Sequence, residues 1–225
     1  MKNRPSGSSA FDLIIFDCDG VLVDSEPLAN RVWVEMLGEF GHFLDYDQSL
    51  AEFAGASMAA RLRVFSERFG WTPPRNFPAL FQTRLEKLME QDLKPIEGIK
   101  EVLSSLRIPH CVASNGNPQE IAFRLAVCDL DQYFGDALFS ATEVPRPKPH
   151  PDVFLAAAAA FHMVPDRCAV IEDSLPGVQA GVSAGMTVFG YAPHADAYRL
   201  QEAGAIVFSS MDQLPELLLV PRFPN

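Results

Sequence analysis

The stretch FDLIIFDCDGVLVDSE, residues 11–26, decides the fold of this chain. Its first six residues form a short apolar run rich in Ile and Phe, which predicts a buried strand. Asp17 and Asp19 follow directly, and Gly20 lets the backbone turn tightly just beyond them. In open α/β sheets, ligands bind outside the carboxyl ends of the strands. The residues that follow each predicted strand are therefore the first candidates for a functional site.

Downstream of Pro95, short apolar runs of the same kind recur. Further strands are predicted over residues 108–113, 137–139, 168–171, 187–191 and 205–208. Helical patterns alternate with these runs, over residues 97–106, 118–127, 152–161, 176–184, 195–203 and 211–219. Such alternation of strands and helices predicts a parallel sheet wrapped by helices.

Residues 27–94 have a different character, because no convincing strand occurs among them. Apolar residues recur there at helical spacing, as in the series at 58, 62, 65 and 69, which Gly70 is expected to end. The expected fold class is therefore α/β, a Rossmann-like parallel sheet core with an inserted all-helical domain. The predicted domains are a disordered lead-in over 1–10, a core from 11–26 and 95–225, and the helical insertion over 27–94.

The composition narrows the class of partner. The chain has 225 residues, with 29 Asp and Glu against 18 Lys and Arg, a formal net charge of −11. That balance argues against nucleic acid or an anionic membrane as a partner.

The longest apolar run, 153–161, has nine residues, whereas a membrane span needs about 20. No secretory signal is recognisable, and the four cysteines form no C-x-x-C pair. We therefore expect free buried thiols in a cytoplasmic protein.

Polar residues also follow the other predicted strands. Ser114 and Asn115 come after the run at 108–113, and KPHPD at 148–152 comes after the run at 137–139. Glu172 and Asp173 come after the run at 168–171. Because the carboxyl ends of parallel strands meet at one edge of a sheet, we expect these residues to converge with the two aspartates of the first strand.

The converging residue types suit a phosphoryl group beside a metal ion. The candidate metal ligands are carboxylates: Asp17, Asp19, Glu172 and Asp173. Hard carboxylate oxygens suit Mg²⁺, and without a metal so many carboxylates would repel one another strongly. Lys148 and the Ser114 hydroxyl are donors suited to a phosphate. Taken singly, each cluster is also typical of an ordinary turn or a solvated loop, so the prediction rests on their combination.

Four motifs match a known family. DCDGVLVDSE at 17–26 resembles the first motif of the haloacid dehalogenase superfamily, and Ser114–Asn115 is similar to its second. KPHPD at 148–152 is similar to its third motif, and EDS at 172–174 to its fourth. The helical block after the first motif corresponds to the family's small helical cap. Within the superfamily, the chain is similar to the branch that holds beta-phosphoglucomutases, phosphoglycolate phosphatases and 6-phosphogluconate phosphatases.

The resemblance implies an enzyme, a phosphoric monoester hydrolase that forms an aspartyl-phosphate. Asp17 would attack phosphorus, and Asp19 would protonate the leaving oxygen and then activate water. Mg²⁺ would bind the Asp17 carboxylate, the Asp19 backbone carbonyl and Asp173, with Glu172 acting through a metal-bound water. The catalytic residues implied are Asp17, Asp19, Ser114 and Lys148, and those that hold the phosphate are Ser114, Asn115 and Lys148.

The expected partner is a small phosphorylated metabolite, a sugar or sugar-acid phosphate, and the expected protein is a monomer or weak dimer. Gly55, Ser57 and Arg61 of the helical cap are candidate substrate contacts, with a solvated helix face as the alternative for Arg61. A beta-phosphoglucomutase-type phosphotransferase and a non-catalytic phosphometabolite-binding protein remain open. Beta-phosphoglucomutases carry a His where this chain has Ala29 and an Arg where it has Met58, and both differences favour hydrolysis.

Two further features have a structural interpretation. Glycines at 177, 181 and 185 recur every four residues, which favours a helix face packed closely on the sheet over a role in any site. Cys18 lies between two candidate site residues, and we expect a small buried side chain there rather than a redox switch.

Overall fold

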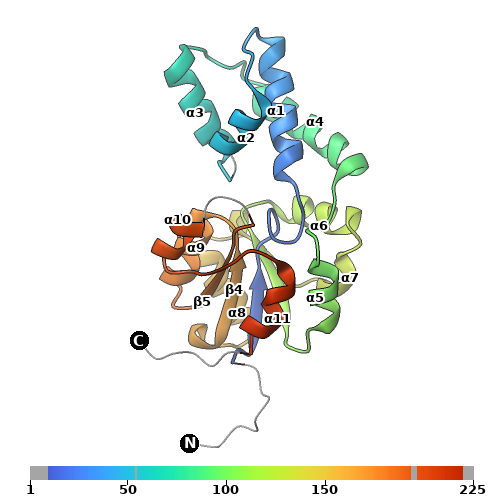
Figure 1. The fold of residues 1–225 in the computed structure, drawn as a ribbon, viewed down its shortest axis with the longest axis vertical. Helices are drawn as coiled ribbons and strands as arrows, with labels where there is room; N and C mark the ends of the chain where they lie inside the picture. Colours follow the sequence, from blue (N-terminus) through green and yellow to red (C-terminus); the bar gives the residue numbers. More distant parts are fainter. Residues whose placement is uncertain (1–9, 54, 194–196, 220–225) are drawn as a thin grey trace, which may run out of the picture. The chain divides into compact units, whose positions relative to one another are not determined.

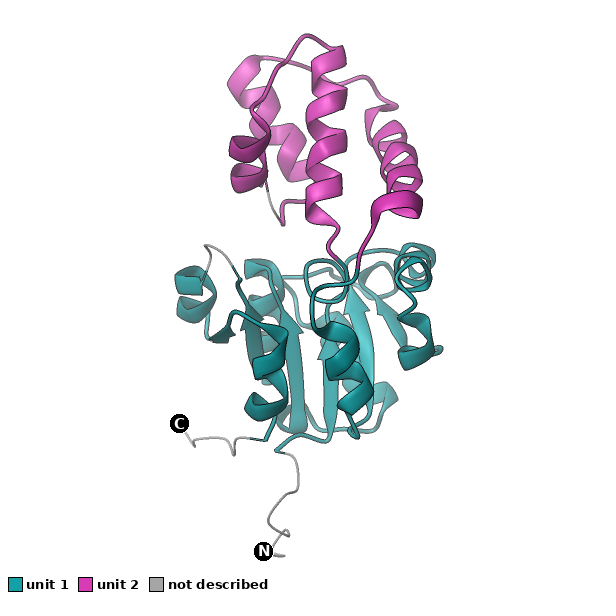
Figure 2. Ribbon diagram, turned by 45° about the vertical axis from the view of Figure 1, so that its right-hand side comes forward, with its two compact units in different colours: residues 1–23, 95–225 teal, residues 24–94 magenta. Residues whose placement is uncertain are grey.

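The computed structural model describes residues 10–53, 55–193 and 197–219, so the expected lead-in falls almost entirely outside the described residues. The chain divides into two compact units (Figure 2). The first, which we call the core unit, comprises Met1–Val23 and Pro95–Asn225, and the second, the helical unit, comprises Asp24–Lys94. The helical unit thus begins at residue 24, whereas the sequence analysis places its start at residue 27.

One six-stranded sheet forms the centre of the core unit, and all its strand pairs are parallel. The strands are β1 (Leu13–Phe16), β2 (His110–Ser114), β3 (Leu138–Ser140), β4 (Cys168–Glu172), β5 (Thr187–Tyr191) and β6 (Ile206–Phe208). Their order is β3-β2-β1-β4-β5-β6, so β1 lies between β2 and β4 (Figure 1). All four β1 residues are buried, as expected for a central strand covered on both faces. The predicted α/β class and parallel sheet are confirmed.

Helices surround this sheet. They are α5 (Ile99–Ser105), α6 (Pro118–Val127), α7 (Asp131–Phe134), α8 (Asp152–Ala160), α9 (Leu175–Ser183), α10 (Ala197–Glu202) and α11 (Leu214–Leu217). The alanine run lies on α8, where Ala157 and Ala158 pack into the core cluster because small side chains let the helix approach the sheet. The single turn α7 was not predicted, and positions 195 and 196 of the predicted helix over 195–203 lie outside the described residues. All four cysteines are free and buried, as expected.

The helical unit contains four helices in its described residues. They are α1 (Glu26–Glu39), α2 (Tyr46–Phe53), α3 (Met58–Phe69) and α4 (Phe77–Asp92). Trp33 of α1 is fully buried, and its ring meets those of Phe53, Phe65 and Phe77 edge-on at centroid distances of 5.8–5.9 Å. Gly70 ends α3 with a φ of 62°, as predicted. In the described part of the chain, no helix combines the length and the apolar character that a membrane span requires.

The two backbone segments that join the units lie side by side. Val23 pairs with Pro95 in an antiparallel bridge. The Ile96 amide donates to the Leu22 carbonyl at 3.0 Å, and the amide of residue 24 donates to the carbonyl of residue 94 at 2.9 Å. The chain therefore leaves the core unit and returns to it at one point, directly after the loop that carries the first motif.

Candidate active site

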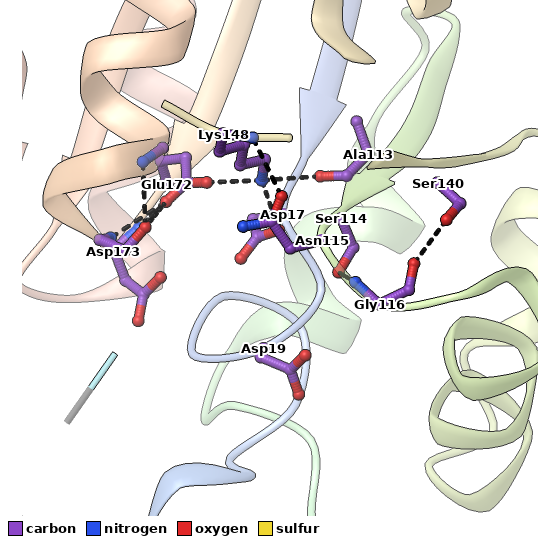
Figure 3. Close-up of polar contacts among 12 residues, drawn as sticks. Asp17, Asp19, Ala113, Ser114, Asn115, Gly116, Ser140, Lys148, Glu172 and Asp173 are labelled. Atoms are coloured by element: carbon purple, nitrogen blue, oxygen red, sulfur yellow. Dashed lines mark hydrogen bonds and ion pairs between the residues drawn. The ribbon is translucent and has the colours of Figure 1, made fainter. Parts of the chain in front are cut away.

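Three neighbouring strands of the core unit bring their last residues together at one edge of the sheet. β1 ends just before Asp17, β2 ends at Ser114, and β4 ends at Glu172. Because β2, β1 and β4 are adjacent and parallel, their carboxyl ends converge (Figure 3). Lys148 reaches the same point from the loop before α8. The structure thus brings together residues that the sequence separates by more than a hundred positions.

Lys148 lies at the centre of this cluster, with a side chain that is only 3% exposed. Its ammonium Nζ donates to Asp17 Oδ1 at 2.7 Å, to Glu172 Oε1 at 2.6 Å and to the Ala113 carbonyl at 2.9 Å. It also lies 4.8 Å from the centre of the Phe154 ring. Burial by itself lowers the pKa of Lys148, but the two carboxylates outweigh it and raise that pKa. The lysine is therefore a charged residue of the site, and the alternative of a solvated loop lysine is wrong.

The carboxyl group of Asp17 is strongly perturbed. Burial raises its pKa to about 7, against the opposing effect of the Lys148 charge, and the negative charge of Glu172 adds to the increase. In the absence of a further cation, Asp17 therefore binds a proton in the neutral range. A cation placed next to it would favour the ionised form, which is the form that can act as a nucleophile.

Three carboxylates of the core unit could hold that cation. One oxygen from each of Asp17, Glu172 and Asp173 lies within 4.8 Å of the other two. The Lys148 ammonium pairs with two of these carboxylates, those of Asp17 and Glu172. Hard oxygen donors gathered this closely fit a divalent ion such as Mg²⁺.

Backbone and hydroxyl donors fix the Glu172 carboxylate in place. Its Oε2 accepts from the Asp173 and Ser174 amides at 3.0 Å each and from the Ser174 hydroxyl at 2.9 Å. Gly177 of α9 makes room for it, because a Cβ there would lie 1.7 Å from Glu172 Oε1. Gly177 thus packs on the last residue of β4, and Gly181 packs on β5, where a Cβ would meet Val188 at 2.6 Å, so the expected close packing of this helix face on the sheet is correct for both. It is wrong for Gly185, which lies beyond the end of α9 with a φ of +76° and no described atom within 4 Å of its Cβ position.

A second close approach occurs in the first motif. Gly20 has a φ of +77°, and a Cβ there would come within 1.9 Å of Asp173 Oδ2. Only glycine combines this backbone conformation with the space that the Asp173 carboxylate occupies.

The loop after β2 has the form of a small polar cradle. The Gly116 amide donates to the Ser114 hydroxyl at 3.1 Å, and the Asn115 side-chain oxygen accepts from the Lys148 amide at 3.2 Å. Ser140, at the end of β3, donates to the Gly116 carbonyl at 2.6 Å (Figure 3). The sequence analysis missed Ser140, although its place at the end of a predicted strand was a signal that could have found it.

Asp19 lies apart from the carboxylate cluster, as Figure 3 shows by the direction of its side chain away from Asp173. Its Oδ2 accepts from Arg124 Nη1 at 3.0 Å. Arg124 was also missed. It lies on the buried face of α6 together with Ile121 and Leu125, and a charged residue at that helical spacing was the available signal.

Two of the candidate contacts of the helical unit, Ser57 and Arg61, have hydrogen-bond partners within that unit. Ser57 caps α3 by accepting from the Ala60 amide at 3.2 Å. The third candidate, Gly55, has a φ of 68°, in the left-handed region. Arg61 is buried, and it donates to Glu26 Oε2 and to the Ala56 carbonyl at 3.1 Å each. The alternative of a solvated helix face for Arg61 is therefore wrong.

Comparisons with known proteins agree with the motifs. The haloacid dehalogenase-like hydrolase family matches residues 11–185. The 6-phosphogluconate phosphatase of Escherichia coli (strain K12) is 32% identical over 210 residues, 93% of this chain and 95% of that protein. A haloacid dehalogenase-like protein of unknown function from Agrobacterium tumefaciens has a TM-score of 0.84 and 37% identity, covering 92% of this chain and 97% of that one. A HAD family hydrolase from Deinococcus radiodurans, crystallised with phosphate and sodium, has a TM-score of 0.80 and 33% identity, covering 96% and 100%.

Proposed function

This chain belongs to the haloacid dehalogenase-like hydrolase family, and on that premise we propose a Mg²⁺-dependent phosphatase that hydrolyses a small phosphorylated sugar or sugar acid through an aspartyl-phosphate. The chain is a hydrolase of phosphoric monoesters. One observation carries the finer proposal. The buried Asp17 carboxylate lies at the end of β1, 2.7 Å from the Lys148 ammonium and in one cluster with Glu172 and Asp173.

The proposed reaction has two displacements at phosphorus. In the first, an oxygen of Asp17 bonds to phosphorus while the ester oxygen leaves and takes a proton from Asp19. In the second, Asp19 accepts a proton from water, the water oxygen bonds to phosphorus, and the bond to Asp17 breaks. Inorganic phosphate is released, and both carboxyl groups return to their starting states.

Donors of the core unit supply the phosphate site. Lys148 carries a positive charge beside the nucleophile, and Ser114 and the Asn115 backbone N–H offer hydrogen bonds to equatorial phosphate oxygens. When bound, Mg²⁺ would be held by the Asp17 and Asp173 carboxylates and the Asp19 carbonyl, with Glu172 behind them, and would neutralise charge between the nucleophile and the anionic phosphate.

Two observations support the proposed substrate class. The relative at 32% identity is named a 6-phosphogluconate phosphatase, which acts on a sugar-acid phosphate. The net charge of −11 disfavours nucleic acid, so a small anion bound by local donors fits better. We place substrate choice in the helical unit, with Gly55 and Ser57 as contacts, and the protein in the cytoplasm as a monomer or weak dimer.

A panel of phosphorylated metabolites at fixed Mg²⁺ tests the proposal. The panel contains 6-phosphogluconate, hexitol phosphates, hexose phosphates and phosphoglycolate, ranked by kcat/KM from phosphate release. We expect sugar or sugar-acid phosphates to lead, with activity lost in excess chelator and when Ca²⁺ replaces Mg²⁺, because Ca²⁺ prefers more oxygens at longer distances. No release from any substrate by the wild-type chain would reject the proposal, and full activity in chelator would reject its metal.

A coupled assay on beta-glucose 1-phosphate with a trace of the bisphosphate separates hydrolysis from mutase activity. The alanine side chain has no donor or acceptor, so Ala29 cannot make the side-chain hydrogen bond that a mutase histidine would make. We expect inorganic phosphate as the main product. Glucose 6-phosphate forming much faster than free phosphate would replace the phosphatase by a phosphotransferase.

A further inference from the structure

We propose that Arg124 is a positioning residue that holds the Asp19 carboxylate on the α6 side of the site, apart from the Asp17–Glu172–Asp173 cluster. The inference rests on the proposed function, because Asp19 is the acid and base of the proposed reaction. Arg124 does not need to touch the substrate in this role. It acts through the orientation of Asp19.

The contact itself is close and mostly buried. Arg124 Nη1 lies 3.0 Å from Asp19 Oδ2, and the two side chains are 9% and 31% exposed. The residues are 105 positions apart in sequence, so only the fold brings them together. A guanidinium also costs more to bury than an apolar residue would, and that cost is offset only where a carboxylate meets it.

Asp19 needs such a partner because a stronger attraction lies close by. It is two residues from Asp17, next to a cluster of three carboxylates whose oxygens lie within 4.8 Å of one another and suit a divalent cation. Without a cation of its own, the Asp19 carboxylate could turn to the same ion as the other three carboxylates. An acid and base held there could not reach the leaving oxygen. Arg124 gives Asp19 a separate, fixed cation on the opposite side.

The surroundings of Arg124 fix its position. Its helix α6 begins with a capping box, in which Asn117 and Glu120 each accept from the other's backbone amide at 2.9–3.0 Å. Gly116 leaves a passage for the guanidinium, because a Cβ there would lie 2.9 Å from Arg124 Nη1. The loop that is proposed to bind phosphate and the residue that orients the acid therefore come from one continuous segment.

This role predicts a change in kcat with little change in KM. Arg124→Met removes the charge and keeps much of the apolar stem, whereas Arg124→Lys keeps the charge without the planar fork. We expect Arg124→Met to lower kcat roughly 10²-fold, the scale of a misplaced catalytic group. Arg124→Lys should recover part of that loss. Arg167→Met is the matched control, since it breaks a part-buried Arg–Asp pair with Asp12 at the opposite end of β1 and β4.

A double-mutant cycle with Asp19→Asn gives the decisive comparison. If Arg124 acts only through Asp19, Arg124→Met should change kcat by less than about twofold in the Asp19→Asn background. A large loss that persists in that background would overturn the proposal. A raised KM with unchanged kcat would also overturn it, because the guanidinium would then contact the substrate.

A measurement without turnover keeps the contact testable if Arg124→Met does not fold. In ¹⁵N-labelled protein, rotation of the Arg124 guanidinium should be slow in the wild type and faster in Asp19→Asn, and equal rotation in both would overturn the proposal. A wild-type chain that releases no phosphate from any substrate would reject the proposed function. The rotation measurement would still decide whether Arg124 holds Asp19.

Discussion

Both units bury a cation against carboxylates, and the two cations differ in the number of carboxylates near them. Lys148 of the core unit meets two carboxylates, those of Asp17 and Glu172, and Asp173 lies close to both. Arg61 of the helical unit meets one, that of Glu26, at 3.1 Å. The first cluster gathers three carboxylates near one ammonium, whereas the second contact is one guanidinium with one carboxylate.

The comparison shows that a buried cation by itself does not identify a catalytic site. Lys148 directs all three of its hydrogen-bond donors to the end of the sheet, and the carboxylate oxygens gathered there are suited to a further cation. Arg61 uses its donors to tie α3 to the start of α1 and to the Ala56 carbonyl. Its Nη1 has no hydrogen-bond partner among the described residues, so the guanidinium is only partly hydrogen-bonded.

The largest effect is expected from neutralising the core cluster at Asp17. Asp17→Asn should abolish turnover while the fold survives, since an amide cannot form the acyl-phosphate and removes one charge from a crowded site. Phosphate release and circular dichroism check the two halves of this prediction. An Asp17→Asn protein with the wild-type rate would end the aspartyl-phosphate mechanism for this chain.

Removing Lys148 should be the next most damaging change. Lys148→Met leaves the buried Asp17 and Glu172 carboxylates without their cation, which costs about 3–5 kcal/mol for a broken buried pair. We expect a lower free energy of unfolding in chelator, a partial recovery on adding Mg²⁺, and a rate loss of roughly 10²–10³-fold from the lost positive charge beside the nucleophile. Denaturant unfolding with and without Mg²⁺ measures the recovery. A Lys148→Met variant as stable as the wild type in chelator would show that Lys148 does not stabilise the buried Asp17 and Glu172 carboxylates.

Gly177→Ala tests the core cluster by adding a single methyl group beside the Glu172 carboxylate. The new Cβ would meet the Glu172 carboxylate, which three hydrogen bonds and Lys148 hold in place. We expect kcat to fall by at least about tenfold, the loss typical of displaced residues behind a metal ligand. Gly181→Ala is the control, because its Cβ would meet Val188 instead and should lower stability with kcat retained. Equal kcat in both variants would contradict the assigned role of Gly177.

The smallest effect on activity is expected from Arg61. Arg61→Met should lower the melting temperature, because Glu26 loses its ion pair with Arg61, while Glu26 is 27% exposed and can be partly hydrated. We expect kcat on the best substrate to stay within about threefold, since the pair is internal to the helical unit. A KM raised much more than this for one substrate only would instead make Arg61 a substrate contact and remove the contrast with Lys148.

Much of the fold could be predicted because each strand is a short apolar run ended by small or polar residues. β5 occupies the predicted residues 187–191, and the other strands differ by one or two positions at their ends. The helix α2 was missed for a physical reason. Its buried residues are Ser49 and Phe53 alone, so it carries no apolar stripe from which a helical period can be recognised.

The candidate site likewise contains some residues that the sequence could predict and others that it could not. Residues at strand ends could be predicted, because a parallel sheet gathers them whatever the intervening sequence. Arg124 and Gly177 could not, since their roles depend on partners that only packing supplies. The partner of Arg124 is Asp19, 105 positions earlier, and Gly177 matters because the Glu172 carboxylate occupies the space of its missing side chain.

The side-by-side course of the chain at Val23 and Pro95 has a consequence for how such an enzyme can diversify. The insertion enters and leaves the core unit through one antiparallel bridge, so its length and contents do not alter the register of any strand. Insertions are best tolerated where the two ends already lie together. If substrate choice lies in the helical unit, as we propose, residues 24–94 form a single cassette whose exchange would change substrate preference while the reacting groups of the core unit stay as they are.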